Sequence, residues 1–342
     1  MAVRKPEGLA QMRGLATQLP NQLRDGFTSA SELDAALPRT ARRVVVVGMG
    51  GSAIAADLLR SVTEPEVDVA LDVARGPTLP RSVGNASVAI LASYSGSTWE
   101  TLAAYDEAGR RGATRVVLTS GGALAQRAHD DHVPHLQLPP GLPPRAAVGY
   151  MIGGLLGLLD PFFPESNDER LHRAADRVES VQAEFSSERG APARMARTIG
   201  ARTPQIYADV SLAALARRWS TQIEENAKRL AHFDQFPEVF HNAIVGWDAL
   251  PAADARRWAV VILEWAGQSP SIAPGIAYLE TLLKRRRVAV VRQAFDADEK
   301  LEALLTGVSF GDHVSLALAE AADADPYPIH AITRLKRAVE RR

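Results

Sequence analysis

The sequence of 342 residues contains no cysteine, which excludes disulfides, thiolate metal ligands and a thiol nucleophile. No uninterrupted apolar run approaches the ~20 residues that a membrane-spanning helix needs. The longest candidate, residues 146–159, is rich in glycine and is followed by Asp160-Pro161. Neither sign of charge dominates, because 39 Lys and Arg residues accompany 40 Asp and Glu residues and the formal net charge is −1. The composition therefore gives no general electrostatic reason to bind nucleic acid or an anionic membrane surface.

The apolar content of 46% and the length of 342 residues are typical of a globular chain with two domains. The first forty residues carry scattered charges and lack the continuous apolar core of a signal peptide. A cytoplasmic protein is the expectation from these features.

From Arg42 the chain alternates between apolar, β-branched runs and amphipathic segments, which favours parallel sheets flanked by helices. Strands are expected at 44–47, 67–72, 87–92, 114–119 and 135–138, and then at 204–208, 258–265 and 287–293. Helices are expected within 5–37 and at 52–62, 98–111, 123–128, 145–159, 210–231, 275–286, 311–322 and 328–341. The predicted fold class is α/β, with two doubly wound domains. The expected division is an N-terminal helical segment (1–40), a first domain (41–160), a helical connector (161–200) and a second domain (201–342).

The segment S-Y-S-G-S-T-W-E-T, residues 93–101, follows the apolar run 88–92 and precedes a helical segment. It concentrates hydroxyl donors, Ser93, Ser95, Ser97 and Thr98, around Gly96. A strand that turns into a helix also presents backbone N–H groups without partners in the helix, so this loop is suited to hold a phosphate group. It does not fit the G-x-x-x-x-G-K-[ST] pattern of nucleotide-binding loops, and a small phosphate ester such as a sugar phosphate fits better. An ordinary serine- and glycine-rich turn with an N-cap is the competing interpretation.

A second loop, G-M-G-G-S at residues 48–52, follows the β-branched run 43–47. It resembles half of a dinucleotide-binding fingerprint but lacks the final glycine and a convincing acidic residue about twenty positions later. The favoured interpretation is a turn at Gly50 and Gly51 that lets a sugar lie against the backbone, with Ser52 at the start of a helix. A dinucleotide-dependent dehydrogenase is the less favoured alternative, and no cofactor is expected.

These two loops, followed by V-V-L-T-S-G-G at residues 116–122, resemble the sugar isomerase (SIS) domain in their order and spacing. Further segments are similar to those of the bifunctional phosphoglucose/phosphomannose isomerases. They are P-R-A-A-V-G-Y (144–150), E-E-N-A-K (224–228), P-E-V-F-H-N (237–242) and D-P-Y-P-I (325–329) followed by Leu335-Lys336. The matches are spread from about residue 43 to 336. The resemblance implies two SIS-type domains and an isomerase that interconverts glucose 6-phosphate, mannose 6-phosphate or both with fructose 6-phosphate.

The same resemblance implies roles for four residues. Glu225 would be the base that moves a proton between carbons 1 and 2 through an enediolate, and Arg145 would stabilise the enediolate charge. His241 would open the sugar ring and would come from the neighbouring subunit, which implies a homodimer. Lys336 would reach the sugar oxygens near the ring-opening site. Ser93, Ser95 and Thr98 would hold the phosphate of a hexose 6-phosphate, and the proposed proton transfer needs no metal ion.

Local sequence alone gives each of these residues a simpler interpretation. Glu225 lies beside Glu224 and close to Lys228, as on a solvated helix face, and the base could be displaced by one position. His241 reads as an exposed loop histidine and Lys336 as a surface lysine. Arg145 at a helix start is mildly unfavourable beside the positive end of the helix dipole, a local conflict that functional residues often show.

Three positions depart from the pattern of the family that the chain resembles. Ser97 replaces the usual asparagine of S-G-N-T, Tyr327 replaces the small hydroxyl residue of D-P-T-P, and Ala317 stands where an aromatic residue is usual. A change of shape near the sugar would follow. A catalytically silent or regulatory sugar-phosphate-binding protein is therefore the alternative function. A DNA-binding regulator is disfavoured, because only about forty residues of mixed charge precede the first strand.

The segment H-D-D-H-V-P-H, residues 129–135, contains three histidines and two acids. It lies on a loop that approaches a strand, away from the predicted phosphate site, and zinc sites without cysteine are a minority among structural sites. No metal is assigned to His129, His132 and His135.

Overall fold

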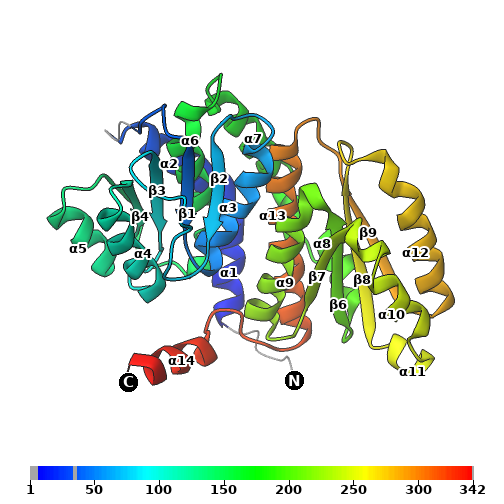
Figure 1. Ribbon diagram of the computed structural model, residues 1–342. Helices are drawn as coiled ribbons and strands as arrows, with labels where there is room; N and C mark the ends of the chain where they lie inside the picture. Colours follow the sequence, from blue (N-terminus) through cyan, green and yellow to red (C-terminus); the bar gives the residue numbers. More distant parts are fainter. Residues whose placement is uncertain (1–6, 34–36, 341–342) are drawn as a thin grey trace. The chain divides into compact units, whose positions relative to one another are not determined.

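The computed structural model describes residues 7–33 and 37–340, except the side chains of Lys336, Arg337, Val339 and Glu340. The chain forms two compact units, and each contains one parallel sheet (Figure 1). The five-stranded unit comprises the described residues within 18–180 and 297–306. The four-stranded unit comprises residues 7–17, 181–296 and 307–340. The predicted α/β fold class with two parallel sheets flanked by helices is confirmed.

The strands of the five-stranded unit have the order β2-β1-β3-β4-β5, and every neighbouring pair is parallel. They are β1 (Arg43–Val47), β2 (Ala70–Ala74), β3 (Ser87–Ala92), β4 (Thr114–Thr119) and β5 (His135–Gln137). All residues of β3 are buried, as expected for a central strand that is covered on both faces. The five predicted strands of this half are present, with β2 beginning three residues later than expected.

The helices of this unit are α2 (Leu19–Ser31), α3 (Gly50–Thr63), α4 (Trp99–Arg110), α5 (Gly122–Asp130), α6 (Val148–Leu159) and most of α7 (Asp168–Ser186). Two of them, α2 and α6, pack closely against each other. Gly149, Gly153 and Gly157 form a stripe on α6 against α2. A Cβ atom at Gly153 would lie 2.1 Å from the carbonyl oxygen of Leu23. The glycine-rich run at 146–159 thus serves close contact between two helices. No helix in the described part of the chain is long and apolar enough to cross a bilayer.

The four-stranded unit has the strand order β7-β6-β8-β9, again entirely parallel. The strands are β6 (Thr203–Asp209), β7 (His232–Phe236), β8 (Trp258–Trp265) and β9 (Ala289–Phe295). The strand β7 was not predicted, because its residues H-F-D-Q-F are mostly polar. This strand lies at the edge of the sheet and leaves His232 and Phe233 exposed, so it needs no continuous apolar run.

The four-stranded unit also contains helices. They are α1 (Glu7–Thr17), α8 (Ala191–Ile199), α9 (Ala213–Ala227), α10 (Ala243–Ala249), α11 (Ala252–Ala255), α12 (Ala273–Arg285), most of α13 (Lys300–Ala321), and α14 (His330–Glu340). The predicted helix at 311–322 was too short, because α13 begins at Lys300. Glycine is unfavourable inside a helix, so Gly307 and Gly311 argue against a long helix here. Both lie inside α13, where Leu215 and Trp219 of α9 approach closely.

The compact units differ from the expected division of the chain. The four-stranded unit takes α1 from the N-terminal segment, and the divisions fall within α7 and α13 rather than near residues 160 and 200. The helical connector expected at 161–200 consists of α7 and α8. The predicted domain boundaries stay a prediction.

Candidate active site

The turn between β1 and α3 brings backbone N–H groups close to the edge of the sheet. Gly50 has a φ of +51°, a conformation that glycine adopts without strain. A Cβ at Gly51 would lie 3.1 Å from the carbonyl oxygen of Pro144, so this position requires close approach. Ser52 is buried in the first turn of α3, and Met49 provides no side-chain cap for that turn. A helix start of this kind is suited to an anionic ligand.

The loop between β3 and α4 contains the predicted cluster of hydroxyl groups. Ser93 is buried and its Oγ donates a hydrogen bond to Oγ1 of Thr98 at 3.0 Å. Ser95 and Ser97 are exposed, and the backbone N–H of Ser97 donates to Oγ of Ser95 at 3.4 Å. The loop therefore has an ordered inner pair of hydroxyls and an outer pair that faces solvent.

The two loops adjoin each other because β1 and β3 are parallel neighbours. Val47 pairs with Leu91, so both strands end at the same edge of the sheet. Ligands bind at this edge in open parallel sheets. The five-stranded unit thus brings together the predicted substrate-binding residues Gly50, Gly51, Ser52, Ser93, Ser95, Ser97 and Thr98.

A third loop, between β4 and α5, braces the loop of hydroxyl groups. The backbone N–H and Oγ of Ser120 both donate to the carbonyl oxygen of Tyr94, at 3.0 and 2.6 Å. The Tyr94 hydroxyl donates to the carbonyl oxygen of Pro139 and accepts from the N–H of Leu142. Tyr94 and Ser120 lie within the predicted motifs, but no role was predicted for them. A large aromatic residue between two serines in a loop was the available signal.

Arg145 lies beside the turn of Gly51, in the same unit. It belongs to a short 3-10 helix, η1 (Pro144–Ala146), rather than to the head of the long helix that the sequence predicted. Only 3% of its surface is exposed, and a Cβ at Gly51 would lie 3.7 Å from the Cα of Arg145. A buried guanidinium next to the Gly/Ser loops can stabilise negative charge on a ligand.

Glu225 lies in the last turn of α9 in the four-stranded unit. Its side chain is half-buried, whereas Glu224 is exposed. The next residue, Asn226, is fully buried and its Nδ2 donates to Oγ of Ser315 at 2.9 Å. The helix then ends at Lys228, which has a φ of +56°. The different exposure of the two glutamates favours Glu225 over its neighbour for chemistry that needs a partly dry carboxylate.

His241 follows the short 3-10 helix η4 (Glu238–Phe240), and its side chain is exposed. Asn242 then caps α10 by accepting a hydrogen bond from the N–H of Ala243. Lys336 lies within α14, but its side chain is outside the described part of the structure. The predicted site residues consequently fall into two groups, with Arg145 and the binding loops in one unit and Glu225, His241 and Lys336 in the other.

Comparison with known proteins relates this arrangement to a family. The profile of the bacterial phospho-glucose isomerase C-terminal SIS domain matches residues 189–339. A bifunctional phosphoglucose/phosphomannose isomerase of Caldicellulosiruptor bescii is 32% identical over 302 residues, which cover 86% of this chain and 88% of that protein. The chain belongs to the bifunctional phosphoglucose/phosphomannose isomerase family. It is thereby placed among the sugar-phosphate isomerases.

The chain is also similar to one further curated protein in sequence and to a solved structure in fold. A D-glucosamine-6-phosphate 4-epimerase of Sulfolobus acidocaldarius is 31% identical over 207 residues, covering 60% of this chain and 64% of that protein. The structure of a glucose-6-phosphate isomerase from Chlamydia trachomatis superposes with a TM-score of 0.73 at 12% identity. That match covers 97% of this chain and 74% of the other. At such low identity the structural match shows the fold alone.

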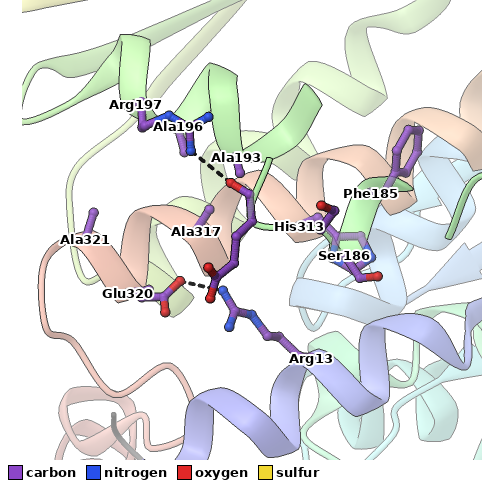
Figure 2. A pocket seen from close by; sticks show the side chains of 12 residues that line it. Arg13, Phe185, Ser186, Ala193, Ala196, Arg197, His313, Ala317, Glu320 and Ala321 are labelled. Atoms are coloured by element: carbon purple, nitrogen blue, oxygen red, sulfur yellow. Dashed lines mark hydrogen bonds and ion pairs between the residues drawn. The ribbon is translucent and has the colours of Figure 1, made fainter. Parts of the chain in front are cut away.

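One of the departures from the phosphoglucose/phosphomannose isomerase pattern, Ala317, lines a cavity of about 420 Å³ in the four-stranded unit (Figure 2). Small side chains of α8 and α13, among them Ala193 and Ala321, line it together with Arg13 of α1, which forms an ion pair with Glu320. His313 is buried in its wall, and burial lowers the pKa of this histidine to about 4. An aromatic residue in place of Ala317 would take up part of this volume.

The histidine-rich segment 129–135 is used for packing and surface contacts in the structure. Asp131 accepts hydrogen bonds from the Tyr105 hydroxyl and from Arg115, both at 2.9 Å. Burial lowers the pKa of His135 at the start of β5. Within residues 7–33 and 37–340, no three His, Asp or Glu side chains are grouped so that they could hold a metal ion.

Proposed function

We propose that the protein is an aldose–ketose isomerase that interconverts glucose 6-phosphate and mannose 6-phosphate with fructose 6-phosphate. The observation that carries this proposal is the pair of Gly/Ser loops at adjoining strand ends, with Arg145 beside them, in a member of this family. The loops contain backbone and hydroxyl donors without a lysine, which suits a small phosphate ester better than a nucleotide.

In this proposal the phosphate of the sugar lies against Ser93, Ser95 and Thr98, with Ser97 at the outer side. The hydrogen bond between Ser93 and Thr98 supports this assignment, because it fixes both hydroxyls before the ligand arrives. Gly50, Gly51 and Ser52 provide backbone that the sugar can approach closely.

Glu225 acts as the base that removes a proton from one of carbons 1 and 2 and returns it to the other. An enediolate forms between these steps, and the buried Arg145 offsets its negative charge. The half-buried position of Glu225 supports its role, since its side chain is less exposed than that of Glu224. The proton transfer is complete without a redox cofactor.

Ring opening precedes proton transfer, and we assign it to His241 with help from Lys336. Histidine exchanges protons near neutral pH. The exposure of His241 supports its delivery to the site of a second subunit, and we propose a homodimer on this basis.

A catalytically silent sugar-phosphate-binding protein is the second candidate. It is favoured by Ser97 and Tyr327, which replace residues that are usual in the family. Tyr327 is half-buried in the segment that precedes α14, so its ring alters the surroundings of the C-terminal helix.

A coupled assay for fructose 6-phosphate formation distinguishes the two candidates. Glucose 6-phosphate and mannose 6-phosphate are supplied separately with EDTA present, and glucosamine 6-phosphate is supplied in parallel with product analysis. Wild type is compared with Glu225→Gln and with the matched neighbour Glu224→Gln. We expect kcat to fall about 10²–10⁴-fold in Glu225→Gln, the usual range for loss of a catalytic base, and to change little in Glu224→Gln.

Turnover that survives Glu225→Gln but collapses in Glu224→Gln would move the base by one residue. Thermal stabilisation by these sugar phosphates without turnover of any would favour the silent binder.

A further inference from the structure

Lys228 connects the end of α9 with a distant segment of the four-stranded unit. Its Nζ donates to the carbonyl oxygens of Glu225, Pro328 (2.8 Å) and Pro326 (3.3 Å). An ammonium group can donate to several acceptors at once, and these three backbone carbonyls lie within hydrogen-bond distance of it. A lysine at the last carbonyls of a helix also interacts favourably with the negative end of the helix dipole.

The segment that Lys228 holds, residues 325–328, packs closely on its other side. The backbone N–H of Tyr327 donates to Oδ1 of Asp325 at 3.0 Å, which closes a local turn. Gly8 of α1 leaves room for this turn, since a Cβ there would lie 2.0 Å from Oδ1 of Asp325 and 2.5 Å from the Cβ of Tyr327. Pro326 is buried.

The helix α14 begins directly after this segment and contains Lys336. All side chains of α14 in the described part of the chain are exposed, including Ile332 (39%) and Leu335 (63%). The described side chains of α14 therefore provide no buried apolar contact that would position the helix. The backbone of residues 325–328, which leads into α14, is the part of this region that is visibly held in place.

We propose that Lys228 is a positioning residue for the isomerase reaction. It ties the end of α9, where Glu225 lies, to the segment that leads into α14 and Lys336. Lys228 acts through these residues, because its ammonium protons are directed at backbone carbonyls. The inference rests on the proposed function, and its structural part is measurable without it.

The test compares Lys228→Asn and Lys228→Arg with wild type. Asparagine tolerates the positive φ of +56° at this position, so Lys228→Asn removes the ammonium group without adding backbone strain. Lys228→Arg retains a cation with several donors. Lys284→Gln is the matched control for loss of an exposed lysine, since Lys284 forms an ion pair with Glu280, one turn away on the same helix α12.

Kinetics provide the first measurement. We expect kcat of Lys228→Asn to fall about 10-fold or more, because small displacements of catalytic groups reduce rates strongly. The KM for the sugar phosphate should change less than about 2-fold, because the phosphate loops belong to the other unit. Lys228→Arg should recover part of kcat, and Lys284→Gln should match wild type.

Backbone hydrogen–deuterium exchange provides the second measurement. We expect faster exchange in Lys228→Asn at residues 323–335 and at the end of α9, with no change in the five-stranded unit. Unchanged exchange would overturn the inference, and so would faster exchange with wild-type kcat. If wild type shows no turnover, the proposed function fails, and exchange alone then decides whether Lys228 holds the segment.

Discussion

His313 is a buried histidine on α13 that has no role in the proposed reaction. Its surface is 4% exposed, and its Nε2 lies 3.1 Å from Oε1 of Gln182. Burial is the largest cause of its lowered pKa of about 4; Asp312 opposes the shift and Arg13 adds to it. The ring is therefore neutral in the folded protein at neutral and mildly acidic pH.

This pKa makes stability depend on pH in a defined window. Below its ordinary pKa of about 6.5 the unfolded chain binds a proton at this histidine, while the folded chain does not until the pH approaches 4. The stability from the neutral buried ring is thus present above pH 6.5 and is lost as the pH falls toward 4. Between pH 7 and 5 the expected loss is about 2 kcal/mol.

His313→Gln should remove this dependence on pH. Urea unfolding at pH 7 and pH 5 is followed through tryptophan fluorescence, which includes Trp219 of the same unit. We expect the stability of wild type to decrease more than that of the variant between the two pH values. Equal decreases in both proteins would show that His313 is protonated in the folded state well above pH 4.

At the scale of elements, the loop between β3 and α4 fits against the loop between β4 and α5 without space for a side chain at Gly96. Gly96 has a φ of +62°, and a Cβ there would lie 1.6 Å from the carbonyl oxygen of Gly121. The N–H of Leu124 donates to the carbonyl oxygen of Gly96 at 2.9 Å. The proposed phosphate site thus depends on contact between two loops.

Gly96→Ala should displace the hydroxyl cluster and weaken sugar-phosphate binding. We expect KM for the sugar phosphate to rise about 10-fold or more, equivalent to at least about 1.4 kcal/mol, because both strain at positive φ and overlap with the neighbouring loop must be relieved. Gly14→Ala on α1 is the control, since nothing lies within 4 Å of a Cβ there. It should bind normally and gain up to about 1 kcal/mol of stability. Normal binding by Gly96→Ala would contradict the assignment of this loop to phosphate.

Much of the fold was predictable because its strands are apolar on both faces. The runs at 44–47 and 88–92 are apolar throughout, and the Gly/Ser loops follow them directly. The edge strand β7 was missed because His232, Asp234 and Gln235 give it no apolar pattern. The start of α13 was missed because Gly307 and Gly311 are explained only by the contact with Leu215 and Trp219, which is tertiary.

The candidate site was predictable to the extent that it is local. The hydroxyl loop lies within six residues, so its function can be inferred from adjacent side chains. Arg145 is buried beside Gly51, 94 positions away in the sequence, and the three carbonyls of Lys228 belong to segments about one hundred residues apart. Such contacts depend on the packing of whole elements and leave no local pattern. The roles of Glu225, His241 and Lys336 stay predictions.

At the scale of the whole molecule, the proposed homodimer makes a quantitative prediction for mixed subunits. If each site takes Glu225 from one subunit and His241 from the other, a dimer of Glu225→Gln with His241→Asn has one site that lacks both groups. Its second site has both. Two variants that are each inactive should therefore regain activity when they are co-expressed, because half of randomly formed dimers are mixed and each has one intact site.

The expected activity of the co-expressed pair is about one quarter of wild type per subunit. Co-expression of Glu225→Gln with the double variant Glu225→Gln/His241→Asn is the control, since no combination of these chains contains an intact site. Size-exclusion chromatography with light scattering measures the oligomeric state of every sample. Dimers that form normally but regain no activity would contradict the shared site, because His241 would then act in the same subunit as Glu225.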